Sequence, residues 1–512
     1  MDTSLLFSRL VSGSVLRALS LFLSAIVAFL MLPFLVENLG TRNYGLWVLV
    51  GTILGYHSIM DFGLSTSVSR FFSNALGKQD FEEINRIISS VLILLFILGI
   101  TIFCIILTTS SFTDLFLEDA VEAQTMKYMI IIIGIAIATQ FPLRTFGGVL
   151  TSTARHDLIV LTELFRLITR SMLVVYFIWK GHGILTLAFI TLFTEMFANL
   201  IEYKFAMSQA PYIKFDKKKI EWDTIKKMFE FGWISFIINI TDMFRNRLIP
   251  LLVAALNGVE MVVFYSVAIR LLEYFVQLMK TTLGITMPIF SQFEGQGKLE
   301  QVKKGYEIML NLTTIAAVFI GANIMFFGKA IITLWMGPTF HLSYIILFIL
   351  TIPHILSLIQ IASEDLLYSI FKHKYIAIVN IISITISVVA SFIFDKYFSE
   401  TGIALGFAIG VGLSSLVMPF IVSRNINSLN VWNLYFKVMI LSTIKILVPL
   451  GIYFYIIHPY VESNFTSLII FCIMEITFMG PILYVILPQK VKGIVNQKVK
   501  FLFNQFSFIV AR

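Results

Sequence analysis

Long apolar segments follow one another along this chain almost without interruption from Gly13 to Leu487. Most are about 20 residues long, which is the length that a helix needs to cross the hydrocarbon core of a bilayer. Strands of membrane barrels are excluded, because they alternate apolar and polar residues over about ten positions. The chain is 58% hydrophobic and only 13% charged, too few polar groups to cover a soluble protein of this length. The sequence therefore predicts an all-α polytopic membrane protein.

We predict about fourteen transmembrane helices with both termini in the cytoplasm. The loops alternate between a basic set, such as Lys214–Lys227 and the tail after Lys490, and a set with few basic residues that includes Asp114–Glu122. Basic loops face the cytoplasm, so both termini are expected there. Two termini on the same side of the membrane require an even number of spans. The expected spans are 13–36, 44–67, 87–109, 125–149, 157–179, 183–205, 228–255, 260–287, 305–327, 342–368, 374–394, 402–423, 433–457 and 465–487.

Weak internal similarity predicts that the chain contains two copies of a six-helix unit. Pro33 lies in sequence similar to that around Pro250, and His156 corresponds to His373 at the same separation along the chain. A unit with an even number of spans keeps both copies in one orientation. We therefore expect two parallel six-helix lobes around a central cavity, plus two extra C-terminal helices. The expected boundaries are 1–206 for the N-lobe, 207–227 for a basic cytoplasmic linker, 228–425 for the C-lobe, 426–489 for spans 13–14 and 490–512 for a cytoplasmic tail.

An unusual number of arginines lie inside the expected spans. Charged side chains are costly in a bilayer, so they normally face a cavity or a partner. A cavity between two such lobes, near the bilayer midplane, is the usual place of a transporter's substrate site. Arginine suits phosphate because its planar fork donates paired hydrogen bonds and stays charged. The candidate substrate-binding residues are Arg17, Arg170, Arg245, Arg247 and Arg270.

Internal ion pairs are the structural alternative for several of these arginines. Residues spaced i,i+3 are neighbours on a helix, and this spacing joins three pairs: Glu163–Arg166, Asp242–Arg245 and Arg270–Glu273. Arg170 has no acidic neighbour left on its stripe of span 5. In the last two spans, Lys445 and Glu475 could pair with each other. We expect Arg170, Arg245 and Arg270 to gather at the cavity between the lobes, with Arg17 lower toward the cytoplasm.

His57 and Asp61 are spaced i,i+4 on the second span, just before Gly63. They could form a proton or cation relay, or a hydrogen-bonded pair that only positions the helix end. No phosphate-binding glycine loop, metal-ligand spacing or G-x-S-x-G sequence is present. The loops are too short to hold a catalytic domain. We therefore expect a transporter rather than an enzyme, without cofactor, metal or nucleic-acid partner.

The N-terminal part of the chain, as far as Ser110, resembles a known family. Pro33 ends span 1, Leu39–Gly40 and Tyr44–Trp47 form an "LG…YGLW" turn, and Asp61 with Gly63 closes span 2. These features are similar to the Wzx-type O-antigen flippases of the multidrug/oligosaccharidyl-lipid/polysaccharide exporter superfamily. The resemblance implies translocation of undecaprenyl-diphosphate-linked repeat units across the bacterial cytoplasmic (inner) membrane by alternating access. It also implies membrane lipid, a polysaccharide polymerase and chain-length proteins as partners, and basic residues that handle the anionic substrate.

Two other function classes stay open at this point. A cation-coupled multidrug antiporter of the same superfamily would show a net acidic cavity. A glycosyltransferase or O-antigen polymerase would need large outward loops with catalytic residues, and the chain lacks them. The sequence indicates neither the identity of the glycan nor the driving force, which could be an ion gradient or mass action.

Overall fold

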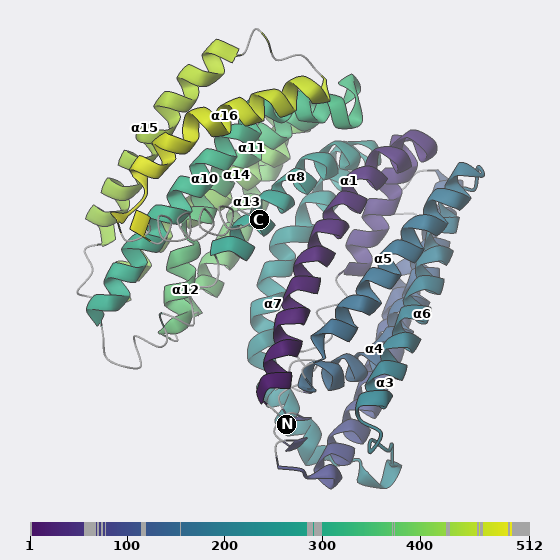
Figure 1. Cartoon of the computed structure of the whole chain (residues 1–512). Helices are drawn as coiled ribbons and strands as arrows, with labels where there is room; N and C mark the ends of the chain where they lie inside the picture. The colour runs from purple at the N-terminus through teal and green to yellow at the C-terminus, as the bar shows by residue number, and fades with distance from the viewer. Residues whose placement is uncertain are drawn as a thin grey trace, which may run out of the picture. The chain divides into compact units, whose positions relative to one another are not determined.

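A computed structural model describes residues 3–55, 78–113, 119–153, 155–283, 299–370, 374–425, 431–457 and 464–489, with a few single residues elsewhere. For residues 3–19, 21, 156, 230–247, 281, 431–437 and 465 it describes the helix backbone but not the side chains. The chain divides into two compact units, Met1–Val263 and Phe264–Arg512. All regular structure in the described residues is helical, which confirms the all-α fold class (Figure 1).

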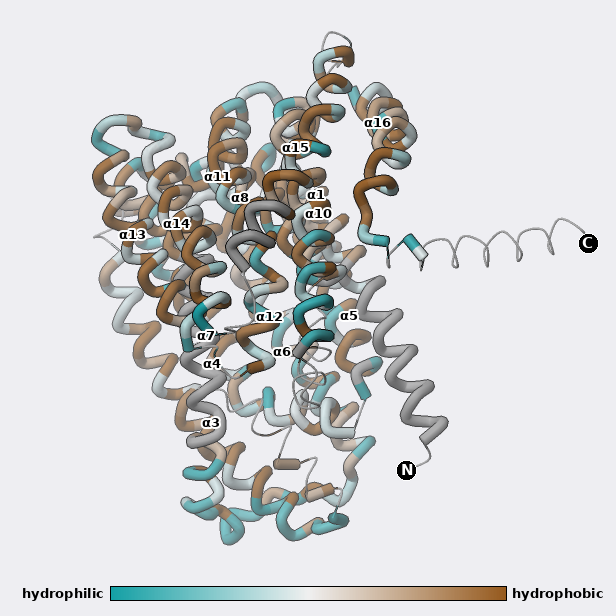
Figure 2. Tube along the Cα trace, turned by 90° about the vertical axis from the view of Figure 1, so that its left-hand side faces the viewer, coloured by the Kyte–Doolittle hydropathy of each residue, from teal (hydrophilic) through white to brown (hydrophobic). Residues whose placement is uncertain are grey.

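The described part of the first unit consists of six long helices. Helix α4 packs against α3 and α6, α5 packs against α1 and α6, and α7 contacts both α1 and α3. These helices are α1 (Thr3–Gly55), α3 (Phe81–Ser110), α4 (Ala120–Ser152), α5 (His156–Trp179), α6 (Leu185–Gln209) and α7 (Trp222–Asn257). Buried aliphatic residues such as Ile88, Val91 and Leu95 line the side of α3 that meets its neighbours. Many large apolar side chains of these helices are exposed, among them Phe96 and Phe193, as a surface in contact with lipid requires. Figure 2 shows apolar residues along most of the described helices.

The second unit places α10 at its centre, with contacts to α11, α12 and α15. Helix α14 packs against α11 and α13, and α16 completes a C-terminal pair with α15. The helices are α8 (Val259–Leu283), α10 (Leu299–Met336), α11 (His341–Ile359), α12 (Ile361–Ser369), α13 (Lys374–Phe398), α14 (Gly402–Asn425), α15 (Val431–Ile457) and α16 (Phe465–Ile486). Ile315 of α10 packs with Ile446 of α15 and Met479 of α16, so the C-terminal pair is fixed to this unit.

Helix order and packing in the second unit repeat those of the first. Helices α10, α11, α13 and α14 follow α3, α4, α5 and α6 at nearly one constant offset along the chain. The contacts of α3 with α4, α4 with α6 and α5 with α6 recur as those of α10 with α11, α11 with α14 and α13 with α14. Gly40 divides α1 at a kink, and Gly258 divides α7 from α8 at nearly the same offset. Both glycines have a φ in the left-handed region, 81° and 90°, which side chains with a Cβ rarely adopt. The repeat expected from sequence is thus a structural repeat.

A stripe of small residues joins α13 to α14. Gly402, Gly406 and Gly410 lie at four-residue spacing on α14. Gly406 faces Ser391 of α13, Gly410 faces the serines at 387 and 383, and Gly402 faces the backbone at Asp395. Ser383 donates a hydrogen bond of 2.9 Å to the Gly410 carbonyl across the interface. A Cβ at Gly406 would collide with the backbone nitrogen of Ser391. The glycines therefore permit the close backbone approach that holds helix pairs together in lipid, where no hydrophobic effect drives association.

The basic linker after α6 is docked on the start of α3. The Lys214 backbone N–H donates to Oδ1 of Asn85 at 2.6 Å, and the Asp216 and Glu221 N–H groups each donate at 3.0 Å to the hydroxyls of Ser89 and Ser90. Asn85 also donates to the Tyr212 carbonyl. Side chains of α3 thus accept hydrogen bonds from backbone N–H groups of the linker that have no partner within a helix.

Replacing Asn85 with alanine should loosen this linker, because two backbone groups of the linker lose their partner. We expect a loss of about 1–3 kcal/mol of local stability, seen as faster proteolysis between residues 210 and 221. Asn38 is a matched control, since its described side-chain bond goes only to the Phe34 carbonyl one turn earlier. Equal cleavage rates for the two variants would contradict the docking role of Asn85.

Within the described residues, nine helical stretches are long and apolar enough to cross a membrane. Three of them, Phe22–Gly55, Pro338–Ser369 and Lys374–Asn425, contain a kink or successive helices. Helices α5 and α8 are not among the nine, and both carry charges inside the expected span. The number fourteen stays a prediction, and so do the expected lobe boundaries.

Candidate functional site

Arg170 lies in the second half of α5 and rests on an aromatic ring. Its guanidinium carbon is 5.9 Å from the ring centroid of Trp47 in α1, within the range of a cation–π interaction. The side chain is half-buried, and it forms no ion pair with a carboxylate among the described residues. A cation held by a ring face keeps its N–H donors available for an anion.

One helical turn earlier on α5, Arg166 forms an ion pair across to α6. Its Nη1 is 2.9 Å from Oε2 of Glu195. The alternative pair of Glu163 with Arg166 is therefore wrong, since no such ion pair occurs in the described part of the chain. The i,i+3 spacing permitted that pair, but α6 brings a second carboxylate to the same guanidinium. Glu195 thus forms its ion pair with Arg166 and lies near Arg170 without pairing with it.

Helix α6 adds two polar groups that the sequence reasoning missed. Asn199 and Glu202 follow Glu195 at spacings of four and three residues, so the three side chains share one face of the helix. Asn199 is buried, and its Nδ2 has no hydrogen-bond partner among the described residues. A side chain at Gly147 of α4 would collide with Glu202, so that glycine makes room for the carboxylate.

We call Arg166, Arg170, Glu195, Asn199 and Glu202 the polar seam of the first unit. Its charged members, two arginines and two glutamates, are balanced, so the seam as a whole carries no net positive charge. The corresponding pair in the second unit, α13 with α14, is joined by glycines and serines instead. The repeat is thus symmetric in backbone but not in charge, and in the described residues only the first unit has a charged seam at this position.

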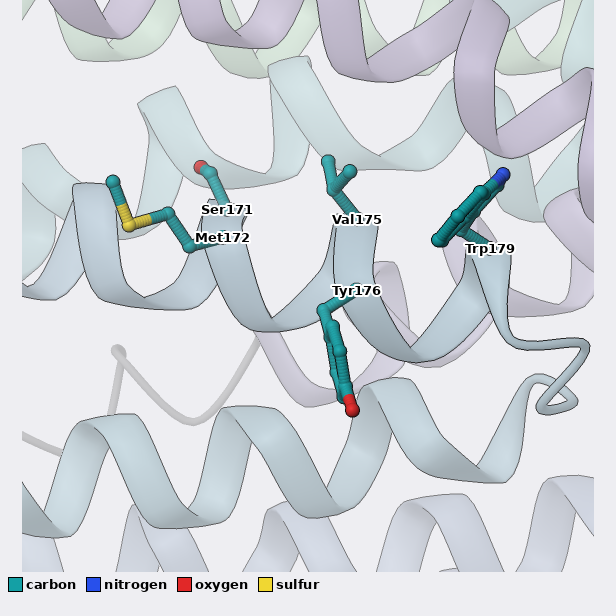
Figure 3. Close-up of a pocket in the computed structure, with 5 residues that line it drawn as sticks. All are labelled: Ser171, Met172, Val175, Tyr176 and Trp179. Carbon is teal, nitrogen blue, oxygen red and sulfur yellow. The ribbon is translucent and has the colours of Figure 1, made fainter.

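A shallow pocket lies on the other side of α5 and does not include Arg170. It is lined by Ser171, Met172, Val175, Tyr176 and Trp179. In Figure 3, Val175 and Trp179 point to one side of the helix and Tyr176 to the other. At 100° per residue, Trp179 is about 180° around the helix from Arg170. This face is apolar and exposed, as expected of a helix side in contact with lipid.

On α8, Arg270 and Glu273 form the ion pair that their spacing predicts. Nη1 of Arg270 is 2.9 Å from Oε2 of Glu273, and their side chains are 44% and 55% exposed. The pair lies at the middle of α8, about 17 Å from either end at 1.5 Å per residue. In the span that the sequence predicts here, an ion pair so exposed cannot face hydrocarbon alone without cost.

The other predicted residues are described only in part or not at all. Arg17 lies in α1, and Arg245 and Arg247 lie in α7, but their side chains are outside the description. His57 and Asp61 fall outside the described residues, so their relay stays a prediction.

The pair that Lys445 and Glu475 could form does not occur in the described residues. Glu475 of α16 is buried and accepts a hydrogen bond of 2.7 Å from Nδ2 of Asn323 in α10. Lys445 is exposed on α15. Asn323 of the neighbouring helix α10, and not Lys445, is thus the partner of Glu475.

Comparison with known proteins identifies the family. Residues 39–345 match the polysaccharide biosynthesis protein family. The chain belongs to this family. It is 23% identical over 410 residues to the uncharacterized membrane protein EpsK of Bacillus subtilis, covering 78% of this chain and 81% of EpsK. It is 19% identical over 425 residues to a candidate O-antigen transporter of Shigella flexneri, covering 81% and 98% of the two chains.

Solved structures share the fold. An inward-facing multidrug resistance MATE family transporter of the MOP superfamily has a TM-score of 0.66 at 16% identity, covering 84% of this chain and 96% of that one. A MOP superfamily transporter from Pyrococcus furiosus, described as having a binding pocket of reverse polarity, has a TM-score of 0.56 at 16% identity, with coverage of 82% and 94%. The resemblance to Wzx-type flippases is thereby confirmed. This member of the polysaccharide biosynthesis family is a multi-pass membrane transporter.

Proposed function

We propose that this transporter moves undecaprenyl-diphosphate-linked oligosaccharide repeat units from the inner to the outer leaflet of the bacterial cytoplasmic membrane by alternating access. The units would then supply assembly of O-antigen or another surface polysaccharide. Membership of the polysaccharide biosynthesis family and the candidate O-antigen transporter of Shigella flexneri support a glycan substrate. A polymerase and chain-length proteins belong to the same proposal as partners.

Arg170 is the single observation that carries the substrate class. A diphosphate brings at least two negative charges into the membrane, and burying them without compensation costs several kcal/mol or more. Arg170 offers a half-buried cation that rests on Trp47 and forms no described ion pair. Arg270 is a second binding residue in the proposal, with the exposed part of its guanidinium available beside Glu273. Arg17, Arg245 and Arg247 complete the proposed set.

A cation-coupled multidrug antiporter is the second candidate. The MATE structures with the same fold favour it, and the carboxylates of Glu195 and Glu202 could hold a cation or proton in the polar seam. That function places binding on acidic groups, so removal of Arg170 would leave transport intact. The two candidates therefore differ in which charge of the seam the substrate needs.

Cells that lack the protein test the proposal directly. We expect them to accumulate lipid-linked oligosaccharide on the cytoplasmic side and to lose surface polysaccharide. The glycan released from that lipid also identifies the sugar. Unchanged lipid-linked oligosaccharide, together with increased sensitivity to cationic drugs, would support the antiporter instead.

Reporter fusions test the proposed topology. Fusions after Lys219 and at Arg512 should report a cytoplasmic location, because the basic loops stay inside. A fusion at Asp119, the N-cap residue of α4, should report the opposite side. A periplasmic result at Arg512 would contradict the even number of spans.

A further inference from the structure

An apolar groove runs between α8 and α10 in the second unit, and nothing described above uses it. Its volume is about 220 Å³. Leu271, Tyr274 and Leu278 line it from α8, and Ile320, Ile324 and Ile331 line it from α10. Gly328 adds a stretch of bare backbone to the lining. The groove is smaller than an ordinary small-molecule pocket of 300–1,000 Å³, so it fits a slim apolar chain.

A polar stripe borders this groove along α8. Arg270, Glu273 and Gln277 follow each other on one side of the helix, and Tyr274 lies only about 40° around the axis from Arg270 at 100° per residue. Tyr274 thus belongs to the groove and also adjoins the ion pair of Arg270 with Glu273. An apolar chain in the groove would place whatever polar group it carries next to that arginine.

The depth of Arg270 separates two kinds of lipid. In the span predicted from the sequence, Arg270 lies near the bilayer midplane, since it is near the middle of α8. The phosphate of a bilayer phospholipid lies about 15 Å from the midplane, outside the hydrocarbon core. A phospholipid chain in the groove would therefore leave Arg270 facing hydrocarbon. A polyprenyl diphosphate differs, because its diphosphate is bonded directly to the first isoprene unit. A carrier lipid in transit brings chain and diphosphate to the same depth.

We propose that the α8–α10 groove holds the first isoprene units of the carrier lipid while Arg270 binds its diphosphate. This inference rests on the proposed function and names a site for the lipid part of the substrate. Arg270 uses Nη1 for Glu273, and a guanidinium carries five N–H donors. The diphosphate can thus bind without breaking the pair, and Glu273 holds the guanidinium in place until substrate arrives.

Photo-crosslinking shows which lipid occupies the groove. Photo-leucine is placed at Leu271 in the full chain, which is purified into phospholipid nanodiscs with undecaprenyl diphosphate as the probe. We expect adducts of undecaprenyl diphosphate with the wild-type chain. In the Arg270→Ala background their amount should fall about tenfold, in proportion to the lower affinity, and a tenfold loss of affinity corresponds to about 1.4 kcal/mol. Adducts with phospholipid alone would overturn the proposal.

Filling the groove gives a second, independent test. Leu278→Trp adds bulk at a 51% exposed position that lines it, and Ile382→Trp on α13 is a control at 53% exposure outside it. We expect Leu278→Trp to lower glycan export about tenfold and Ile382→Trp to leave it unchanged, since the indole ring at 278 would occupy space that the isoprene units need. Equal export by both variants, in cells whose wild-type protein exports glycan, would overturn the groove while leaving the proposed function intact. Failure of the wild-type protein itself would overturn the function first.

Discussion

Replacing Arg170 with alanine should reduce glycan export about thirtyfold or more, with the protein still present in the membrane. The expected size follows from the cost of about 2–5 kcal/mol when one member of a desolvated charge pair is removed. The pair here would be the guanidinium above Trp47 and the substrate diphosphate. Export is measured as surface polysaccharide per molecule of transporter.

Two further variants separate binding from folding at this position. Arg170→Lys keeps the charge but loses the planar fork, so it should restore export only in part. Lys204→Ala removes an exposed cation from α6 and should have no effect. Full export by Arg170→Ala would remove this residue from the mechanism and favour the antiporter.

Replacing Gly406 with alanine should have the largest effect on folding. The new Cβ would collide with the backbone of α13 at Ser391, so the two helices must separate. Helix pairs in lipid depend on such close contact, and overpacking costs about 1–3 kcal/mol or more. We expect a lower yield of folded protein and a lower unfolding temperature in detergent.

Gly412 on the same helix provides the matched control. A Cβ there would be 4.0 Å from the nearest atom, Cβ of Pro353, which is an ordinary van der Waals contact. Gly412→Ala should therefore be neutral or slightly stabilising, because alanine favours helices over glycine. Equal stability of the Gly406 and Gly412 variants would show that α13 and α14 do not need the small-residue stripe.

The fold could be predicted from the sequence because its signals are long and periodic. Apolar runs indicated the helical class, and matched positions such as Pro33 and Pro250 revealed the repeat that Gly40 and Gly258 now mark in the backbone. The small-residue stripe on α14 was visible as four-residue spacing. We did not predict a close helix contact from it, because glycine and serine are common in membrane helices. The contact is recognised only when the serines of α13 are seen opposite the glycines of α14.

The candidate site was harder to predict because ion pairs depend on neighbours from other helices. Arg270 and Glu273 pair on one helix, so their spacing sufficed. Arg166 had a suitable partner on its own helix in Glu163, yet it binds Glu195 of α6, and no local pattern distinguishes these choices. Glu475 likewise takes Asn323 of α10 instead of Lys445. The sequence thus identifies which charges lie inside the spans, while packing decides how each of them is paired.

Translocation by the purified protein tests the central proposal most directly. The full chain is reconstituted in liposomes that carry undecaprenyl-diphosphate-linked oligosaccharide, and the glycan reaching the opposite leaflet is counted with an impermeant glycosidase. We predict transfer that requires the protein and is lost in the Arg170→Ala variant. Wild-type liposomes that move no lipid-linked glycan, but exchange a cationic dye for protons or sodium, would contradict the proposal.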